Sequence, residues 1–506
     1  MSSSKQIKLG AVISYIAIAF NMVAGLIYTP WMITKIGQGN YGLYTLANSL
    51  ITMFVMDFGM GAAVSRFVSR YNAEGNQKAV NNFLGVVYKL YFAIDIIIFT
   101  ALIIVYFFID TIYANLSAQE IETFKVLYAI VGMFSIVSFP FTNLNGILTA
   151  YEKFIQLKLC DLFHKAFIVT AMVIALIMGQ GVYALVTINA VAGLITIAMK
   201  LIIIRHKTKV RVNFKFFDKS LLKNIFGFSV WTTIGSLAQR LIFNITPSII
   251  AAVSATGSAG VAIFGLASTI EGYVYTFATA INGMFMPRIS KIIVSGKKEE
   301  ELMPLMIKIG RIQLMIIGII TVGFIALGRS FVVDIWRKPD FVLSYYCAVF
   351  LIIPSVFYLP MQIANTTLIV ENQVKLQAEV FVIMGVINVV CSLILSKIYG
   401  ALGASISIFI AYMIRTILMS VIYHKNLKLD MCMFFKETFL KLSLYLILTL
   451  IVGVLLEVFN PLPHGILRFI VNGVLLVGVF ILLMITRGFN KYEKDLFLGI
   501  IKKLKK

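Results

Sequence analysis

Long and nearly uninterrupted apolar runs constrain this chain more than any other feature of its sequence. The clearest are Phe92–Phe108, Leu314–Leu327 and Leu442–Leu456. Runs approaching 20 residues are typical of helices that cross a membrane. Apolar residues make up 60% of the chain and charged residues 13%, against about 25% charged residues in an ordinary soluble domain. A large soluble helical core would need polar helix faces, which these runs lack, so the sequence predicts an all-α integral membrane protein.

The apolar runs predict about fourteen transmembrane helices. The first begins near Leu9 and is longer than the apolar part of a signal peptide, so we interpret it as a retained helix. The predicted spans are 9–32, 41–64, 83–108, 125–149, 159–178, 182–204, 225–253, 259–286, 309–328, 342–368, 376–396, 400–423, 437–457 and 465–486.

Basic residues gather in alternate loops between these spans. The formal net charge is +22, which in a soluble protein would suggest nucleic acid as a partner. Here the charges lie at span ends and follow the rule that cytoplasmic loops are rich in Lys and Arg. The longest basic loop runs from Arg205 to Lys223. The pattern predicts cytoplasmic termini and gives no reason to expect nucleic-acid binding.

A motif near the start of the chain has a fainter copy about 220 positions later. The first copy spans Thr29–Gly75, with a short Gly turn between two apolar helices. Leu46–Ala47 recurs as Leu266–Ala267, and Arg66 aligns with Arg288. This offset covers six spans, an even number, so both copies should point the same way across the membrane, as in transporters built from repeats.

The repeat predicts two six-helix lobes around a central cavity, followed by two appended helices. The C-terminal tail is amphipathic and basic, which favours an interfacial helix on anionic lipids, with a solvated charged tail as the alternative. The predicted domains are the N-lobe 1–204, the basic cytoplasmic linker 205–224, the C-lobe 225–424, the appended spans 425–486 and the amphipathic tail 487–506.

Three charged residues lie deep enough in predicted spans to be candidates for substrate binding. A charge near the centre of a bilayer costs about 2.5–3.5 kcal/mol on insertion scales and needs a partner or a wet cavity. Arg240 and Glu271 have matching depths in adjacent spans. Arg240 would meet an anionic group of the substrate, with Glu271 as its partner or as a cation site, or the two would form a static buried pair. Arg415 would line the cavity or extend to the cytoplasmic interface. Arg311, near a span end, is expected to be an interfacial anchor.

Two carboxylates inside predicted spans are candidates for coupling transport to an ion gradient. Asp57 and Asp95 lie in the second and third spans. A buried carboxylate can bind Na⁺, or can carry a proton if burial raises its pKa. The alternative for each is a hydrogen bond within the helix bundle.

The motifs of several enzyme classes are missing from the sequence. The chain has no GxxxxGK[ST] phosphate loop, no HExxH and no CxxC pair. Its four cysteines are scattered, which argues against a metal site. The predicted loops are too short for a soluble catalytic domain. We therefore expect a protein that is not an enzyme and that holds no metal or organic cofactor.

The stretch Thr29–Gly75 resembles the start of the polysaccharide-transport family of lipid-linked oligosaccharide flippases. The shared elements are Gly37, Gly39, Tyr41–Tyr44, Asp57–Gly61 and Arg66. That family belongs to the multidrug, oligosaccharidyl-lipid and polysaccharide exporter superfamily. The resemblance implies a two-lobed fold, alternating access, and movement of an undecaprenyl-pyrophosphate-linked oligosaccharide to the outer leaflet of a bacterial cell membrane. Glycan polymerases or glycosyltransferases would be its partners.

The resemblance also implies which charged residues face the cavity, and it shows one departure. It places Asp57, Arg240 and Glu271 on cavity-lining helices. Family members often carry an acidic residue just before the arginine of the seventh span, where this chain has Gln239. An ion-coupling role for that acid therefore does not transfer to this chain.

Three function classes follow from the sequence. The leading hypothesis is a flippase for an anionic lipid-linked glycan. The second is a cation-coupled drug or metabolite antiporter of the same fold, which should favour carboxylates over an arginine in its cavity. The third is a membrane enzyme of glycan assembly.

Overall fold

The computed structural model describes residues 22–55, 60–279, 285–336 and 338–495, and these residues contain helices but no strand. Ten helices in this part of the chain are long and apolar enough to cross a membrane. One of them, α16 (Val374–Leu427), has a non-helical Gly400 with φ 58° and therefore covers two predicted spans. The all-α membrane fold is confirmed, whereas the count of fourteen spans stays a prediction.

The chain divides into two compact units. The first unit comprises Met1–Gly265 with Gly385–Ala404, and the second comprises Leu266–Met384 with Ser405–Lys506. These bounds follow contacts between helices, not the sequence repeat, so the predicted lobe boundaries stay a prediction. Helix α11 (Gly257–Thr279) begins in the first unit and continues into the second, and α16 passes through both.

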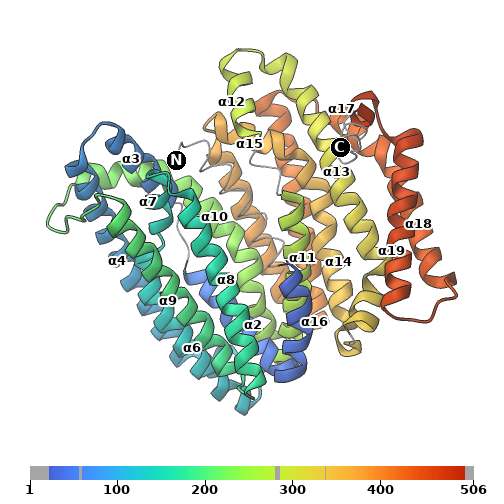
Figure 1. Cartoon of the computed structure of the whole chain (residues 1–506), viewed down its shortest axis with the longest axis horizontal. Coiled ribbons are helices and arrows are strands. Elements are labelled where there is room, and N and C mark those ends of the chain that lie inside the picture. The colour runs from blue at the N-terminus through green and yellow to red at the C-terminus, as the bar shows by residue number, and fades with distance from the viewer. Residues whose placement is uncertain (1–21, 56–59, 280–284, 337, 496–506) are drawn as a thin grey trace. The chain divides into compact units, whose positions relative to one another are not determined.

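In the first unit, long helices lie side by side, as α4, α6 and α9 do in Figure 1. Side chains cap several of them: Ser117 and Glu120 form a reciprocal capping box at the start of α6. The elements of this unit are α2 (Gln38–Phe54), α3 (Met60–Ala73), α4 (Gln77–Phe107), α5 (Ile109–Ile112), α6 (Ala118–Ser138), η1 (Phe139–Phe141), α7 (Leu144–Ala150), α8 (Phe154–Ile177), α9 (Val182–Lys207) and α10 (Lys219–Val253).

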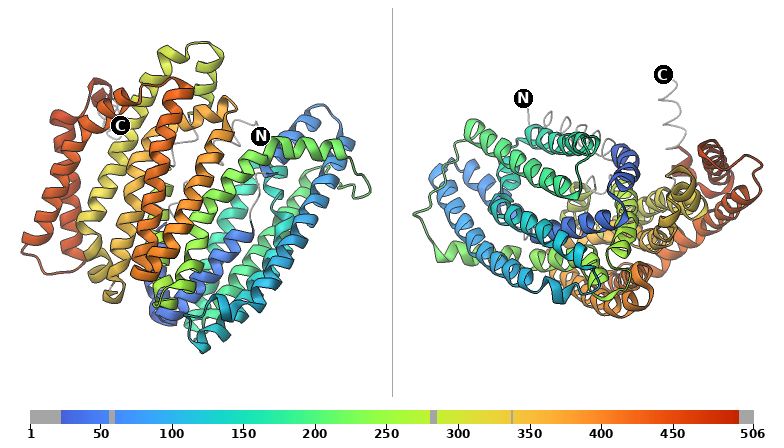
Figure 2. Two further views of the ribbon diagram at one scale, coloured as in Figure 1. Left: turned by 180° about the vertical axis from the view of Figure 1, so that it is seen from behind. Right: turned by 90° about the horizontal axis from the view of Figure 1, so that it is seen from below.

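In the second unit, α13 packs against both α14 and α18, and the last two long helices, α18 and α19, lie side by side in Figures 1 and 2. The elements of this unit are α12 (Met286–Val294), α13 (Lys298–Ser330), η3 (Phe331–Ile335), η4 (Pro339–Phe341), α14 (Val342–Tyr358), η5 (Leu359–Met361), α15 (Gln362–Val370), α17 (Met431–Phe435), η6 (Lys436–Leu440), α18 (Lys441–Phe459), α19 (Ile466–Leu483) and η7 (Met484–Gly488).

The sequence repeat has a counterpart in the local backbone of each unit. A proline-containing turn interrupts a long helix at η1 in the first unit and, 220 positions later, at η5 in the second. The turn before the next long helix has a left-handed residue in both units, Glu152 with φ 54° and Asn372 with φ 59°. Non-glycine residues adopt this conformation rarely, so the offset of 220 marks a structural repeat.

Candidate functional site

The glycine motif of the first unit allows very close helix packing. A Cβ atom on Gly42 would lie 2.0 Å from the carbonyl oxygen of Ser258, and one on Gly39 would lie 3.3 Å from the Ser258 Oγ. The Ser258 hydroxyl also donates a hydrogen bond to Glu120. Glycine is required here because any side chain on residue 42 would overlap the backbone of α11. The motif therefore builds the contact between α2 and the first turns of α11.

The two copies of the motif meet at equivalent positions. Thr45 and Gly265 are 220 residues apart, the offset of the repeat, and both belong to the first unit. A Cβ atom on Gly265 would lie 2.6 Å from the Thr45 Cγ2. The repeat in the sequence thus corresponds to two segments that pack directly on each other.

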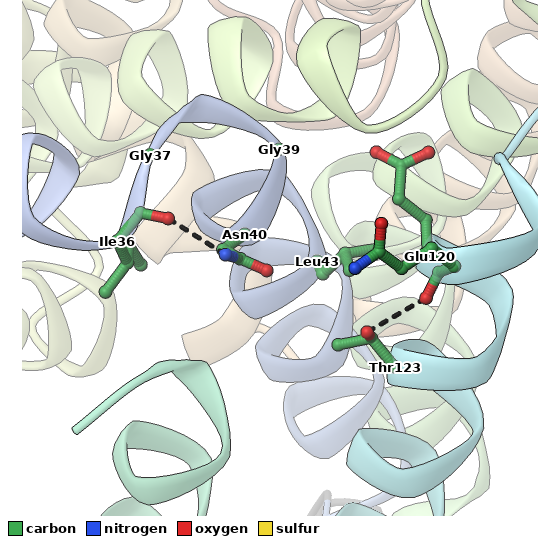
Figure 3. A pocket seen from close by; sticks show the side chains of 8 residues that line it. Ile36, Gly37, Gly39, Asn40, Leu43, Glu120 and Thr123 are labelled. Atoms are coloured by element: carbon green, nitrogen blue, oxygen red, sulfur yellow. Dashed lines mark hydrogen bonds between the residues drawn. The ribbon is translucent and has the colours of Figure 1, made fainter.

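A polar pocket of about 310 Å³ lies next to this contact. Figure 3 shows its lining, in which the Asn40 side chain donates to the Ile36 carbonyl over 2.9 Å. Glu120 is the acidic side chain of the pocket, and its carboxylate accepts hydrogen bonds from Ser117 and Ser258. These bonds engage the Glu120 carboxylate at the contact between α6 and α11. We therefore assign Glu120 to helix packing and not to ligand binding.

Replacing Gly42 by alanine is expected to destabilise the first unit by about 1–3 kcal/mol, since the new methyl group forces α2 away from Ser258. Thermal unfolding of the purified protein measures this effect. The matched control is Gly473→Ala on α19, because a Cβ atom there meets nothing within 4 Å. A Gly42→Ala protein as stable as the control would contradict the close packing.

Arg240, the arginine predicted to meet the substrate, lies on α10 in the first unit. It is half-buried, and its Nη1 donates to the Thr52 carbonyl of α2 over 3.1 Å. Among the described residues, this bond uses one of the five N–H donors of the guanidinium group. Glu271 belongs to the second unit, so the predicted pairing of Arg240 with Glu271 stays a prediction.

The structure describes one of the two ion-coupling candidates, Asp95, and not the other. Asp57 lies outside the described residues. Asp95, on α4, is 8% exposed, and its Oδ1 has no hydrogen-bond partner among the described residues. Burial without a partner is costly for a carboxylate, so Asp95 is an unusual residue in an otherwise apolar helix.

Arg415, on α16 in the second unit, is surrounded by aromatic rings. Its guanidinium carbon lies 4.7 Å from the ring centroid of Tyr358, 5.1 Å from that of Phe381 and 5.9 Å from that of Tyr412. Such distances allow cation–π attraction. Arg415 is only 7% exposed, so its side chain does not extend to the interface. The aromatic rings hold the guanidinium group inside the unit.

None of the ion pairs in the part of the chain that the structure describes involves Arg415. Its Nε is buried and has no hydrogen-bond acceptor among those residues. A buried cation whose neighbours are rings rather than carboxylates retains its capacity to bind an anion. We therefore take Arg415 and its rings as the candidate binding site of the second unit.

Glu271, on α11, is the acidic residue of the same neighbourhood. It is 8% exposed and interacts electrostatically with Tyr275, Tyr358 and Tyr412. Arg415 also interacts with Tyr275 and Tyr412. The structure thus brings two of the predicted substrate-binding residues, Glu271 and Arg415, to one aromatic cluster.

Sequence reasoning missed the aromatic members of this cluster. Tyr412 precedes Arg415 by three residues, a spacing that places both on one helix face. That signal could have been found. Tyr358 and Phe381 lie on α14 and on the first part of α16, far from Arg415 in sequence, and no local pattern connects them to it.

The comparison with protein families decides the family. The family model described as "Polysaccharide biosynthesis protein" matches residues 8–293, more than half of the chain. The chain belongs to this family. The family predicted from the Thr29–Gly75 motif is thereby confirmed.

Solved structures give the fold of this family member. It is similar to "Lipid II flippase MurJ, inward closed conformation", with a TM-score of 0.68, 17% identity, and coverage of 93% of this chain and 97% of that one. A second is an inward-facing multidrug resistance MATE family transporter of the MOP superfamily, with a TM-score of 0.64, 15% identity, and coverage of 83% and 98%. A third is a MOP superfamily transporter from Pyrococcus furiosus, with a TM-score of 0.58, 15% identity, and coverage of 85% and 96%.

These structures show that the polysaccharide biosynthesis family member has the fold of MOP superfamily transporters and is a multi-pass membrane protein. A search of curated proteins returned no match.

Proposed function

We propose that this chain is a flippase for an anionic lipid-linked glycan. It moves an oligosaccharide carried on a lipid pyrophosphate, of the undecaprenyl type, from the inner to the outer leaflet by alternating access. It works in polysaccharide biosynthesis and export, in the cytoplasmic membrane of a bacterium, with both termini in the cytoplasm. Family membership and the flippase among the structural neighbours support the reaction class.

One observation supports an anionic substrate more than any other: Arg415 is a buried cation among aromatic rings. Leaving a charge buried without a counter-ion costs several kcal/mol, and the stacked rings offset only part of that cost. A phosphate would complete the site, because the planar guanidinium group donates two parallel hydrogen bonds to it. Arg240, with most of its donors uncommitted to Thr52, is the matching candidate in the first unit.

The lipid part of such a substrate needs no polar site. It stays in the hydrocarbon region while the sugar head group crosses, so membrane lipids surround it throughout. Glycosyltransferases or a glycan polymerase are the expected partners, because a translocated oligosaccharide must be made on one side and used on the other.

The second candidate is a cation-coupled drug or metabolite antiporter. The buried carboxylate of Glu271 favours it, since a cationic compound would be drawn to an acidic residue among aromatic rings, and MATE transporters are among the structural neighbours. A membrane enzyme of glycan assembly is the third candidate, and it has the least support.

A translocation assay in proteoliposomes tests the proposal. We expect a fluorescent oligosaccharide on a polyprenyl pyrophosphate to reach the opposite leaflet faster with the protein than in protein-free vesicles. A cationic dye, offered with an inward or outward Na⁺ or proton gradient, should not move. Transport of the dye but not of the lipid-linked sugar would establish the antiporter instead.

A further inference from the structure

The seam between α4 and α6 in the first unit contains a carboxylate that the proposed substrate site does not use. Four residues at helical spacing form the buried stripe of α4, namely Tyr91, Asp95, Ile98 and Leu102. The neighbouring Phe92, Ile96 and Phe99 are exposed, as expected for side chains that face lipid. Asp95 is therefore the charged residue of an inward-facing apolar stripe.

Three contacts fix the register of α4 against α6. The Tyr128 hydroxyl donates to the Leu102 carbonyl over 3.0 Å. A Cβ atom on Gly132 would lie 3.8 Å from the Leu102 Cδ1. At the other end, the rings of Tyr91 and Phe139 are 5.2 Å apart. The helices are antiparallel, so residues with higher numbers on α4 face residues with lower numbers on α6.

This register places Asp95 opposite Ser135. Ser135 lies three residues after Gly132 and four before Phe139, so it belongs to the face of α6 that these residues turn toward α4. It is fully buried, and its Oγ has no hydrogen-bond partner among the described residues. The register therefore gives facing positions on α4 and α6 to two residues with a buried oxygen, the Asp95 Oδ1 and the Ser135 Oγ, that has no hydrogen-bond partner among the described residues.

A proline adds a third oxygen close by. Pro140 lies in η1, directly after α6. Because proline has no N–H group, it cannot donate to the carbonyl four residues earlier, which is that of Ile136. The end of α6 thus has a main-chain acceptor beside Ser135 that lacks its usual helical partner.

The repeat supplies an internal comparison for this seam. Ser135 corresponds to Ser355, 220 positions later, and the following turns η1 and η5 also correspond. The Ser355 hydroxyl donates to Tyr358 over 3.2 Å and is satisfied within the protein. The offset of 220 places the apolar Met315 at the position of Asp95, and alignment of the starts of α4 at Gln77 and α13 at Lys298, an offset of 221, places the apolar Ile316 there.

The second unit shows which features of the seam helix packing needs. An apolar residue, Met315 or Ile316, holds the equivalent position in the second unit, so helix packing there does not require a carboxylate. The first unit has the carboxylate and lacks the tyrosine that satisfies the serine. Ser138 holds the position of Tyr358, and its hydroxyl donates to the Ser135 carbonyl rather than to the Ser135 Oγ. An explanation by packing alone leaves both unsatisfied oxygens unaccounted for.

We propose that Asp95 and Ser135 form a binding site for a monovalent cation, with Na⁺ as the ion to test. The site offers only oxygen acceptors, which suit a hard cation. Its single carboxylate balances one positive charge, whereas a divalent ion would leave a net charge buried in an apolar seam. The site lies on α4 and α6 of the first unit, and its oxygens come from neither of the proposed substrate residues, Arg240 and Arg415.

Binding of ²²Na⁺ to the purified, detergent-solubilised full-length protein tests this site. We expect saturable binding that unlabelled Na⁺ displaces. Asp95→Ile, which copies the second unit, and Asp95→Asn should each weaken binding by about tenfold or more, because a charged ligand is lost. Ser135→Ala should weaken it several-fold, while the matched control Ser355→Ala should bind as the wild type does.

Folding of each variant is checked by thermal unfolding in choline chloride, which supplies no Na⁺. If neither Asp95 variant folds, unchanged Na⁺ affinity in Ser135→Ala would by itself overturn the proposal. Absence of saturable Na⁺ binding to the wild type would do the same. The assay contains no glycan, so its failure would not bear on the flippase proposal.

Discussion

Glu493→Ala is expected to lower the free energy of unfolding by about 3–5 kcal/mol, the largest stability effect we predict. Glu493 is 3% exposed and forms an ion pair with Arg311, which is 4% exposed, at 2.6 Å from Nε to Oε1 and 3.0 Å from Nη2 to Oε2. Removing the carboxylate leaves the guanidinium group buried without a counter-ion, and an uncompensated buried charge is far more costly than a missing contact.

The same arginine also connects three segments of the second unit. Its Nη1 donates to the Glu437 carbonyl and its Nη2 to the Gly488 carbonyl, each over 2.9 Å. Next to the pair, the Lys308 ammonium lies 3.3 Å from the ring centroid of Tyr492. Loss of Glu493 should therefore release the residues after η7 from α13, in addition to lowering global stability.

Thermal or denaturant unfolding in detergent measures this prediction, and limited proteolysis reports release of the C-terminal segment. The double variant Arg311→Met with Glu493→Leu should recover most of the loss, because it removes both charges together. The matched control is Glu74→Ala, which breaks the exposed pair with Arg70 and should have no measurable effect. A Glu493→Ala protein as stable as this control would refute the buried ion pair.

Arg415→Ala is expected to reduce translocation of a lipid-linked pyrophosphate glycan by about a hundredfold or more, the largest functional effect we predict. Two charge-assisted hydrogen bonds to phosphate contribute about 1.5–3 kcal/mol each, and the variant loses both. Arg415→Lys should give an intermediate rate. Lysine keeps the charge, but it lacks the planar set of N–H donors and the flat surface that stacks on the rings.

The proteoliposome assay compares these variants at equal amounts of folded protein. Arg70→Ala is the control, because Arg70 is exposed and pairs only locally with Glu74. One further variant separates anion binding from packing. Tyr358→Leu removes the stacked ring but keeps the cation, so it should impair translocation less than Arg415→Ala does. Wild-type rates in Arg415→Ala would remove this residue from the substrate site.

Local sequence predicted the class and the family of this protein. Apolar runs such as Phe92–Phe108 identify membrane helices because the signal depends only on neighbouring residues. The motif around Tyr41–Tyr44 predicted the family for a similar reason, and the family model confirms it. The repeat at an offset of 220 was also found from sequence, and the paired turns η1 and η5 show how far it extends.

The burial and the partners of individual charged residues were predicted less well. Arg311 was expected to be an interfacial anchor, and this was wrong: its partner Glu493 lies 182 residues away and buries it. For Arg415, the sequence leaves two alternatives open, a side chain that lines the cavity or one that extends to the interface. In the structure the side chain is buried between the rings of Tyr358 and Phe381. For Asp95, no local pattern indicates the unsatisfied hydroxyl of Ser135 across the seam.

Sequence alone therefore determined that the chain is a helical, repeated membrane protein of a polysaccharide-transport type, because hydropathy, loop charge and short motifs are local properties. Only the tertiary structure decided which charged groups are neutralised and which remain available. The cost of a buried charge depends on its nearest neighbours in space, and for Arg311, Arg415 and Asp95 those neighbours come from helices that are distant in the chain.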